Sequence, residues 1–249
     1  MKKILFVVCT HGNELAGLHL FLTHPYGRVK NTEWEVLIGN PEAMTLNQRF
    51  LETDLNRSFN AKWATSYEEK RAQALKKRFK KYDVVYDIHT TSAIKSQALD
   101  DCMFVNTIDA KAIEACSYIS AKHIIWDSDV KYNRRYLTGH HPVGVTLEYQ
   151  KSSDYFEDVN RIMSDFYNIV SAHKSDVFPK FLYKADRPVT QSEQLKYKLN
   201  FSDFHPLSEQ DKKILKLKNQ EEYAPVFVNP PEVDPEFYCF LNKRINLVV

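Results

Sequence analysis

The sequence lacks a cysteine-rich pattern, a long hydrophobic run and a secretory signal. Its cysteines are few and scattered without C-x-x-C spacing: Cys9, Cys102, Cys116 and Cys239. This pattern argues against a disulfide framework or a cysteine zinc site and fits a reducing cytoplasm. No apolar run approaches the roughly 20 residues that span a bilayer. The start "MKKILFVVC" has too short an apolar stretch for a secretory signal, so we interpret it as a buried first strand.

The sequence also lacks a charge excess. Lys and Arg number 34 against 32 Asp and Glu, which leaves a formal net charge of +2. Charge alone therefore predicts neither a nucleic-acid nor a membrane partner. We find no internal repeat and no low-complexity segment. With 249 residues, 43% of them hydrophobic, the chain can bury a sizeable core.

Apolar runs alternate with helical patterns over the first 175 residues. Strands are predicted at 4–9, 33–40, 82–89, 101–106, 122–126 and 143–149, and helices at 14–24, 66–82, 110–121 and 154–174. Ser66 and Glu69 are spaced as a capping box. In the last helix the residues expected to face inward are Phe156, Val159, Met163, Phe166 and Val170. The alternation predicts an α/β fold with a largely parallel sheet covered by helices on both faces.

The pattern changes near Asp176. Prolines become more frequent, apolar runs such as "ILKLK" and "APVFVN" are short, and helical periodicity is weak. We therefore expect two domains, a main domain over 1–175 and a small β-rich C-terminal domain over 176–249.

Chemically versatile side chains follow three of the predicted strands. His11 and Glu14 come after the first strand, His89 ends the strand "DVVYDIH", and Glu148 ends "VGVTLEY". Sites in open α/β sheets form at the carboxyl ends of strands. Two His and one Glu are the protein ligands of a catalytic zinc site that leaves one position open. Glu148 would then be available as a general acid/base.

The loop between the predicted strand 33–40 and the predicted helix 66–82 could bind an anionic substrate. The segment "NQRFLETDLNRSF" contains Arg49, Asp54, Asn56 and Arg57. The arginine fork binds carboxylates in bidentate fashion, and an amide can supply a further donor. An arginine can also polarise a carbonyl oxygen as it becomes an oxyanion. For Asp54 we favour a role in supporting the loop.

Together these segments resemble the succinylglutamate desuccinylase/aspartoacylase family, which is related to the zinc carboxypeptidases. The resemblance rests on "HGNE", "DLNR", "DIHTT" and "VTLE", which occur in the family's order within residues 5 to 150. It implies one Zn²⁺ per chain held by His11, Glu14 and His89, with Glu148 as general acid/base. It also implies that Arg49 polarises the scissile carbonyl, while Asn56 and Arg57 bind the substrate's carboxylate. The implied reaction is hydrolysis of an N-acyl amino acid.

The chain departs from the aspartoacylase branch of the family at two places. That branch has a substrate-contacting tyrosine shortly after the C-terminal "VFVN" stretch, whereas this chain has "PPEVDPEFY", and Tyr238 lies further on. A further substrate-binding arginine precedes the base-bearing strand in that branch, and Arg134 and Arg135 are the candidates here. These differences concern substrate identity rather than the catalytic chemistry.

Other functions remain open on the sequence alone. A zinc carboxypeptidase acting on peptides would use the same centre, and a non-catalytic scaffold would bind metal without turnover. The basic residues of 66–82 could contact nucleic acid, but few aromatics are interleaved among them, and we favour a solvated face. His140 and His141 are not counted as ligands. We expect a cytoplasmic protein that acts on a small molecule, without a nucleic-acid or membrane partner, and that could form a homo-oligomer.

Overall fold

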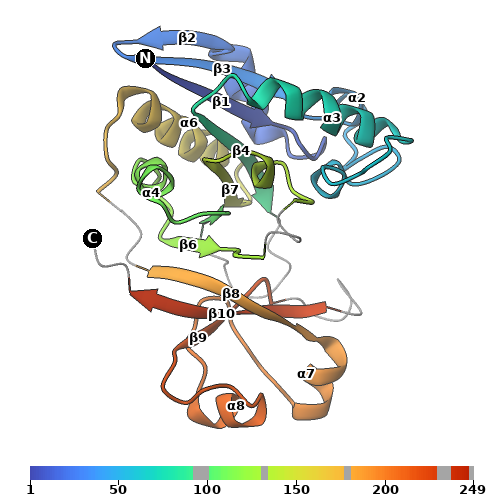
Figure 1. The fold of residues 1–249 in the computed structure, drawn as a ribbon, viewed down its shortest axis with the longest axis vertical. Helices are drawn as coiled ribbons and strands as arrows, with labels where there is room; N and C mark the ends of the chain where they lie inside the picture. The colour runs from blue at the N-terminus through green and yellow to red at the C-terminus, as the bar shows by residue number, and fades with distance from the viewer. Residues whose placement is uncertain (92–100, 130–133, 177–180, 229–236, 247–249) are drawn as a thin grey trace.

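In the described part of the chain, ten strands form one sheet, with strand order β2-β3-β1-β4-β7-β5-β6-β8-β10-β9 (Figure 1). The structure is a computed structural model that describes residues 1–91, 101–129, 134–176, 181–228 and 237–246. The strands are β1 (Lys2–Val8), β2 (Tyr26–Val29), β3 (Thr32–Ile38), β4 (Val84–Thr91), β5 (Cys102–Val105), β6 (His123–Trp126), β7 (Gly144–Gln150), β8 (Phe181–Thr190), β9 (Tyr223–Val226) and β10 (Phe237–Asn246).

The helices flank this sheet. The α-helices are α1 (Leu18–Thr23), α2 (Pro41–Thr45), α3 (Tyr67–Phe79), α4 (Ala110–Cys116), α6 (Tyr155–Ser171), α7 (Gln191–Tyr197) and α8 (Glu209–Ile214). Short 3-10 helices are η1 (Leu15–Gly17), η2 (Leu55–Arg57) and η3 (Thr138–His140). None of the described helices combines the length and the apolar character that crossing a bilayer would require.

The centre of the sheet is parallel. β1 pairs with β3 and β4, and β4 pairs with β7, all in parallel register, while β5 runs antiparallel to β7. Alternate residues of β1 enter different layers, because successive strand side chains point to opposite faces. Phe6 packs in a core with α6, whereas Leu5 and Val7 pack in a second core with α3. Helices therefore cover both faces, which confirms the predicted fold class.

Most predicted elements are present, with differences at their edges. The predicted helix 14–24 is divided into η1 and α1, and the sequence analysis missed the edge strand β2 and helix α2. Phe156 does not face inward as expected, since its exposed fraction is 68%. It lies in the first turn of α6, beyond the core that Val159, Phe166 and Val170 enter.

Helix α3 begins at the predicted capping box, because Ser66 and Glu69 each accept a bond from the other's backbone N–H. Its basic face is not simply solvated as predicted. Arg71 donates to the carbonyls of Gly39 and Ile38, and Lys76 donates to the carbonyl of Phe59 at 2.7 Å. These cations thus stabilise the ends of neighbouring segments.

The C-terminal strands extend the main sheet instead of forming a sheet of their own. β8 pairs in parallel with β6, and β10 lies between β8 and β9 in antiparallel register. A separate hydrophobic cluster, which includes Val189, Leu215 and Tyr238, lies under α7 and α8. The run "ILKLK" is not a strand, because α8 ends at Ile214 within it. The expected boundary at 175/176 stays an interpretation, and residues 177–180 beside it lie outside the described residues.

Candidate metal centre and substrate site

Three side chains converge at the carboxyl ends of two neighbouring parallel strands. His11 and Glu14 follow β1, and His89 lies in β4, which pairs with β1 (Figure 1). His11 Nδ1 lies 2.6 Å from Glu14 Oε1, and His89 Nδ1 lies 2.9 Å from Glu14 Oε2. The two Nδ1 atoms are 3.2 Å apart. Within the described part of the chain, this is the one group of three such side chains close enough to share a metal ion.

Carboxylates behind the two histidines orient their rings. Asp87 Oδ2 lies 2.8 Å from His89 Nε2, and the other Asp87 oxygen accepts a bond from the Thr10 hydroxyl at 2.6 Å. Asp54 Oδ1 lies 3.2 Å from His11 Nε2. Each carboxylate can accept a proton from the Nε2 atom it faces, so in the neutral rings both Nδ1 atoms would be available to bind a metal ion.

The donor set fits zinc. Zinc accepts His nitrogens and carboxylate oxygens, and catalytic sites use three protein ligands with one open position. Two ligands at about 2.0–2.1 Å and the tetrahedral angle lie roughly 3.3 Å apart. The two Nδ1 atoms are 3.2 Å apart, close to this value, whereas the His–Glu separations of 2.6 and 2.9 Å are shorter and are those of hydrogen bonds. All three candidate ligand atoms lie within 4.8 Å of one another.

The electrostatics of this centre favour positive charge. Burial disfavours the charged form of His89, but the nearby Asp87 and Glu14 still hold its pKa well above the usual value. Burial would raise the pKa of Glu14, yet His89 and the hydrogen bond from His11 hold it well below the usual range. The buried carboxylate of Asp87 and the half-buried one of Glu14 thus flank the histidines, which is an environment suited to a cation.

Glu148 lies beside the three candidate ligands without belonging to them. It is the register partner of His89 across the β4–β7 pair, and its Oε2 accepts a hydrogen bond from the Thr91 hydroxyl. Burial raises the pKa of Glu148, and the charge on His89 opposes that rise. The structure therefore places a carboxyl group of increased basicity next to the candidate metal centre.

Arg49 approaches the same centre from the loop after α2. Its Nη2 donates to Asp54 Oδ2 at 3.1 Å, and its Nη1 lies 3.8 Å from Glu14 Oε1. The loop can come this close because residue 12 is glycine: a Cβ there would lie 2.5 Å from the Gln48 carbonyl oxygen. The Gly12 N–H donates to the Arg49 carbonyl at 3.1 Å. Gly12 of "HGNE" thus allows the loop to place Arg49 next to the candidate metal centre.

Asn56 and Arg57 lie in η2, next to the histidines. The side chain of Asp54 caps η2 by accepting from the Asn56 N–H at 2.8 Å. Asn56 accepts a bond from the Leu137 N–H at 3.1 Å, and its side-chain nitrogen lies 3.5 Å from His89 Nε2. The Arg57 guanidinium lies over the Tyr136 ring, 4.6 Å from the ring centroid. All seven residues expected at the site therefore gather in one region.

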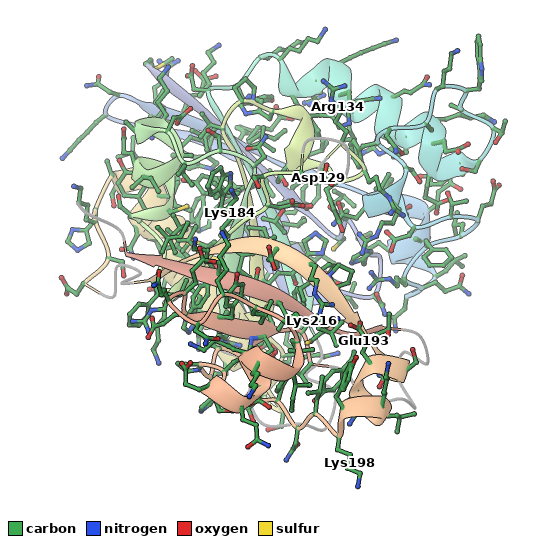
Figure 2. The ribbon with its side chains drawn as sticks, turned by 60° about the horizontal axis from the view of Figure 1, so that its bottom comes forward. Asp129, Arg134, Lys184, Glu193, Lys198 and Lys216 are labelled. Atoms are coloured by element: carbon green, nitrogen blue, oxygen red, sulfur yellow. The ribbon has the colours of Figure 1, made fainter. Side chains whose placement is uncertain are left out.

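The remaining candidates lie at different distances from this region. The Arg135 carbonyl accepts from the Phe59 N–H at 3.3 Å, which puts this segment beside the loop of Arg57. Figure 2 shows Arg134 in the half of the molecule that contains α3, away from Glu193 and Lys198 in the C-terminal part. Tyr238 is buried in the C-terminal cluster, where its hydroxyl accepts from the Phe201 N–H. The segment 229–236, where a tyrosine is missing, lies outside the described residues.

Sequence reasoning missed two carboxylates that support the site. Asp87 had a detectable signal, because residues i and i+2 of a strand share a face and "DIH" therefore sets Asp87 beside His89. Glu68 had none, since its neighbour Glu69 carries the helix-capping pattern. Glu68 is fully buried and accepts from three backbone N–H groups of the loop that leads to Asp54.

Comparison with known proteins points to one family. The model of the succinylglutamate desuccinylase/aspartoacylase catalytic domain matches residues 1–162. Aspartoacylase of Xenopus tropicalis is 31% identical over 201 residues, which are 68% of this chain and 63% of that protein. A probable aspartoacylase of Prochlorococcus marinus (strain MED4) is 39% identical over 102 residues. That match covers 37% of this chain and 35% of the relative, so it spans about a third of the relative's length.

The fold is also found in solved structures. The succinylglutamate desuccinylase of Chromobacterium violaceum superposes with a TM-score of 0.74 over 100% of this chain and 86% of that one. The sequence identity is 16%, so this likeness concerns the fold.

Proposed function

Because this chain belongs to the succinylglutamate desuccinylase/aspartoacylase family, we propose that it is a zinc-dependent amidohydrolase that cleaves the amide bond of an N-acyl amino acid. The observation that carries this proposal is the meeting of His11, Glu14 and His89 beside Glu148, which is not one of the three. A centre of this kind pairs three metal ligands with a separate proton acceptor.

In this proposal each side chain has a defined role. His11, Glu14 and His89 would hold the zinc ion, which would act as a Lewis acid and make a nearby water molecule acidic, with a pKa of about 7. Glu148 accepts the proton of the attacking water and returns it to the leaving amide nitrogen. Arg49 donates hydrogen bonds to the carbonyl oxygen as negative charge develops there. Asn56 and Arg57 bind the substrate's carboxylate.

The substrate is proposed to be small. An N-acyl amino acid presents one carboxylate to Arg57, whose guanidinium is already oriented by its contact with Tyr136. The cytoplasmic location and a homo-oligomeric state stay predictions.

Metal analysis combined with an amine-release screen tests the proposal. The purified protein should contain about one zinc ion per chain and release free amino acid from acetyl, succinyl or other acyl derivatives of Asp, Glu, His or neutral amino acids. Turnover of peptides alone would replace the proposal with a carboxypeptidase. Bound zinc without any turnover would indicate a non-catalytic scaffold.

A further inference from the structure

Glu68 lies outside the candidate centre but is bonded to the loop that builds it. Its side chain, from the first turn of α3, has an exposed fraction of 0%. One carboxylate oxygen accepts from the Leu51 N–H at 2.7 Å and from the Asn40 side chain at 3.2 Å. The other accepts from the Glu52 and Thr53 N–H groups, both at 3.2 Å. Three consecutive backbone donors thus converge on one buried carboxylate.

These three residues join Arg49 to Asp54. These residues belong to neither a strand nor a helix, so their backbone N–H groups do not bond to backbone carbonyls there. The Glu68 carboxylate supplies the acceptors instead. A carboxylate accepts stronger hydrogen bonds than a neutral oxygen does, especially where water is excluded. Glu68 therefore fixes the path of the loop rather than merely lying next to it.

Asp54, at the end of this loop, contacts two residues of the candidate site. Asp54 contacts His11 Nε2 at 3.2 Å through one oxygen and Arg49 Nη2 at 3.1 Å through the other. A shift of the loop would therefore move the carboxylate that holds both the Arg49 side chain and the His11 ring.

The substrate-binding pair has additional supports. Asn56 accepts from the Leu137 N–H, and Arg57 lies over Tyr136, both outside this loop. Besides its hydrogen bond to Asp54, the guanidinium of Arg49 has only a longer ion-pair contact among the described residues, with Glu14 at 3.8 Å. Loosening the loop should consequently disturb Arg49 more than the carboxylate-binding pair.

We propose that Glu68 is a positioning residue that holds the loop 51–53 and thereby aligns Asp54 and Arg49 with the candidate metal centre. This inference rests on the proposed function only for its kinetic consequence. The bonding of the loop to Glu68 can be tested in the protein without substrate or metal.

The test compares Glu68→Gln with Glu69→Gln. Glutamine keeps the size of Glu68 but offers one acceptor oxygen, so its NH₂ group would oppose at least one backbone N–H. Glu69 is the matched control: its side chain accepts from the Thr65 and Ser66 N–H groups and from the Thr65 hydroxyl at the start of the same helix, outside residues 51–53. Both variants weaken the N-terminal turn of α3.

Two readouts separate positioning from general destabilisation. In the metal-free protein, amide hydrogen exchange at residues 51–53 should become at least tenfold faster in Glu68→Gln and stay unchanged in Glu69→Gln. In the zinc-loaded protein, with the best substrate from the screen, kcat should fall at least tenfold in Glu68→Gln while KM changes less than threefold. Glu69→Gln should retain both constants.

Unchanged exchange at residues 51–53 in Glu68→Gln would overturn the proposal, and so would equal losses of kcat in the two variants. If the wild-type protein hydrolyses no N-acyl amino acid, the proposed function fails and the exchange comparison alone decides the role of Glu68. If Glu68→Gln does not fold, the same measurements on Glu68→Asp against Glu69→Asp decide it. Aspartate keeps the charge but is shorter by one methylene group, so its carboxylate cannot reach all three N–H groups. The proposal again requires faster amide hydrogen exchange at residues 51–53.

Discussion

Replacing Glu148 by glutamine should remove most of the turnover and leave the metal in place. Glutamine has almost the same volume, and its amide oxygen can still accept the bond from the Thr91 hydroxyl, so β7 should fold as before. The variant lacks only a group that can take a proton from water. A positioned general base contributes roughly 10²–10⁴-fold, or about 3–5 kcal/mol of transition-state stabilisation. Because burial raises the basicity of this carboxyl group, we expect a loss in kcat of about 10³-fold or more.

The assay measures kcat by amine release and zinc by elemental analysis on the same preparation. Zinc content should equal that of the wild type, since Glu148 is not among the three converging donors. Glu157→Gln, the same chemical change at an exposed position of α6, is the control and should be fully active. A Glu148→Gln protein that retains zinc and more than a tenth of the wild-type kcat would refute the assignment of the base.

Three further perturbations test other parts of the site and fold. His89→Ala should reduce bound zinc to a small fraction of one ion per chain, which elemental analysis after dialysis would measure; full occupancy would remove His89 from the ligand set. Arg57→Ala should raise KM for acidic substrates about tenfold or more with little change in kcat, and an unchanged KM would exclude it from carboxylate binding. Burial raises the pKa of Asp165 from 3.8 to about 6, against the hydrogen bond from Tyr149. The folded state therefore binds the Asp165 proton more tightly than the unfolded state does. The resulting contribution to folding stability is complete below pH 3.8 and is lost as pH rises through about 6. The free energy of unfolding of the wild type, measured in urea, should thus fall by about 2 kcal/mol relative to that of Asp165→Asn between pH 4 and 7, and parallel pH profiles would contradict this.

The core strands and the long helices could be predicted because their signals are local. β1, β4 and β7 are short apolar runs with polar residues at their ends, and α3 starts at a capping box that needs only four residues to be recognised. The elements that were missed lack such signals. β2 has only four residues, mostly exposed, and exists because it can pair with β3.

The C-terminal region shows the same limit. Its short apolar runs indicated strands, and β8, β9 and β10 are present. Nothing in those runs could reveal that β8 would pair with β6 and continue the main sheet, because strand pairing depends on residues that lie far apart in the sequence. The inward placement of Phe156 was wrong for a related reason. Helical spacing gives the direction of a side chain but not where the core ends.

The sequence by itself determined which kinds of side chain would stand at the ends of the strands: His11 and Glu14 after the first strand, and His89 and Glu148 in two later ones. That follows from local patterns, since each motif directly follows or ends an apolar run. Only the tertiary structure decided that β1, β4 and β7 lie side by side, so that these groups meet within hydrogen-bonding distance or in register. It also decided that Asp87, Asp54 and Glu68 stand behind them. A buried carboxylate is held by donors brought to it from elsewhere in the chain, and such partners have no fixed spacing that a sequence could display.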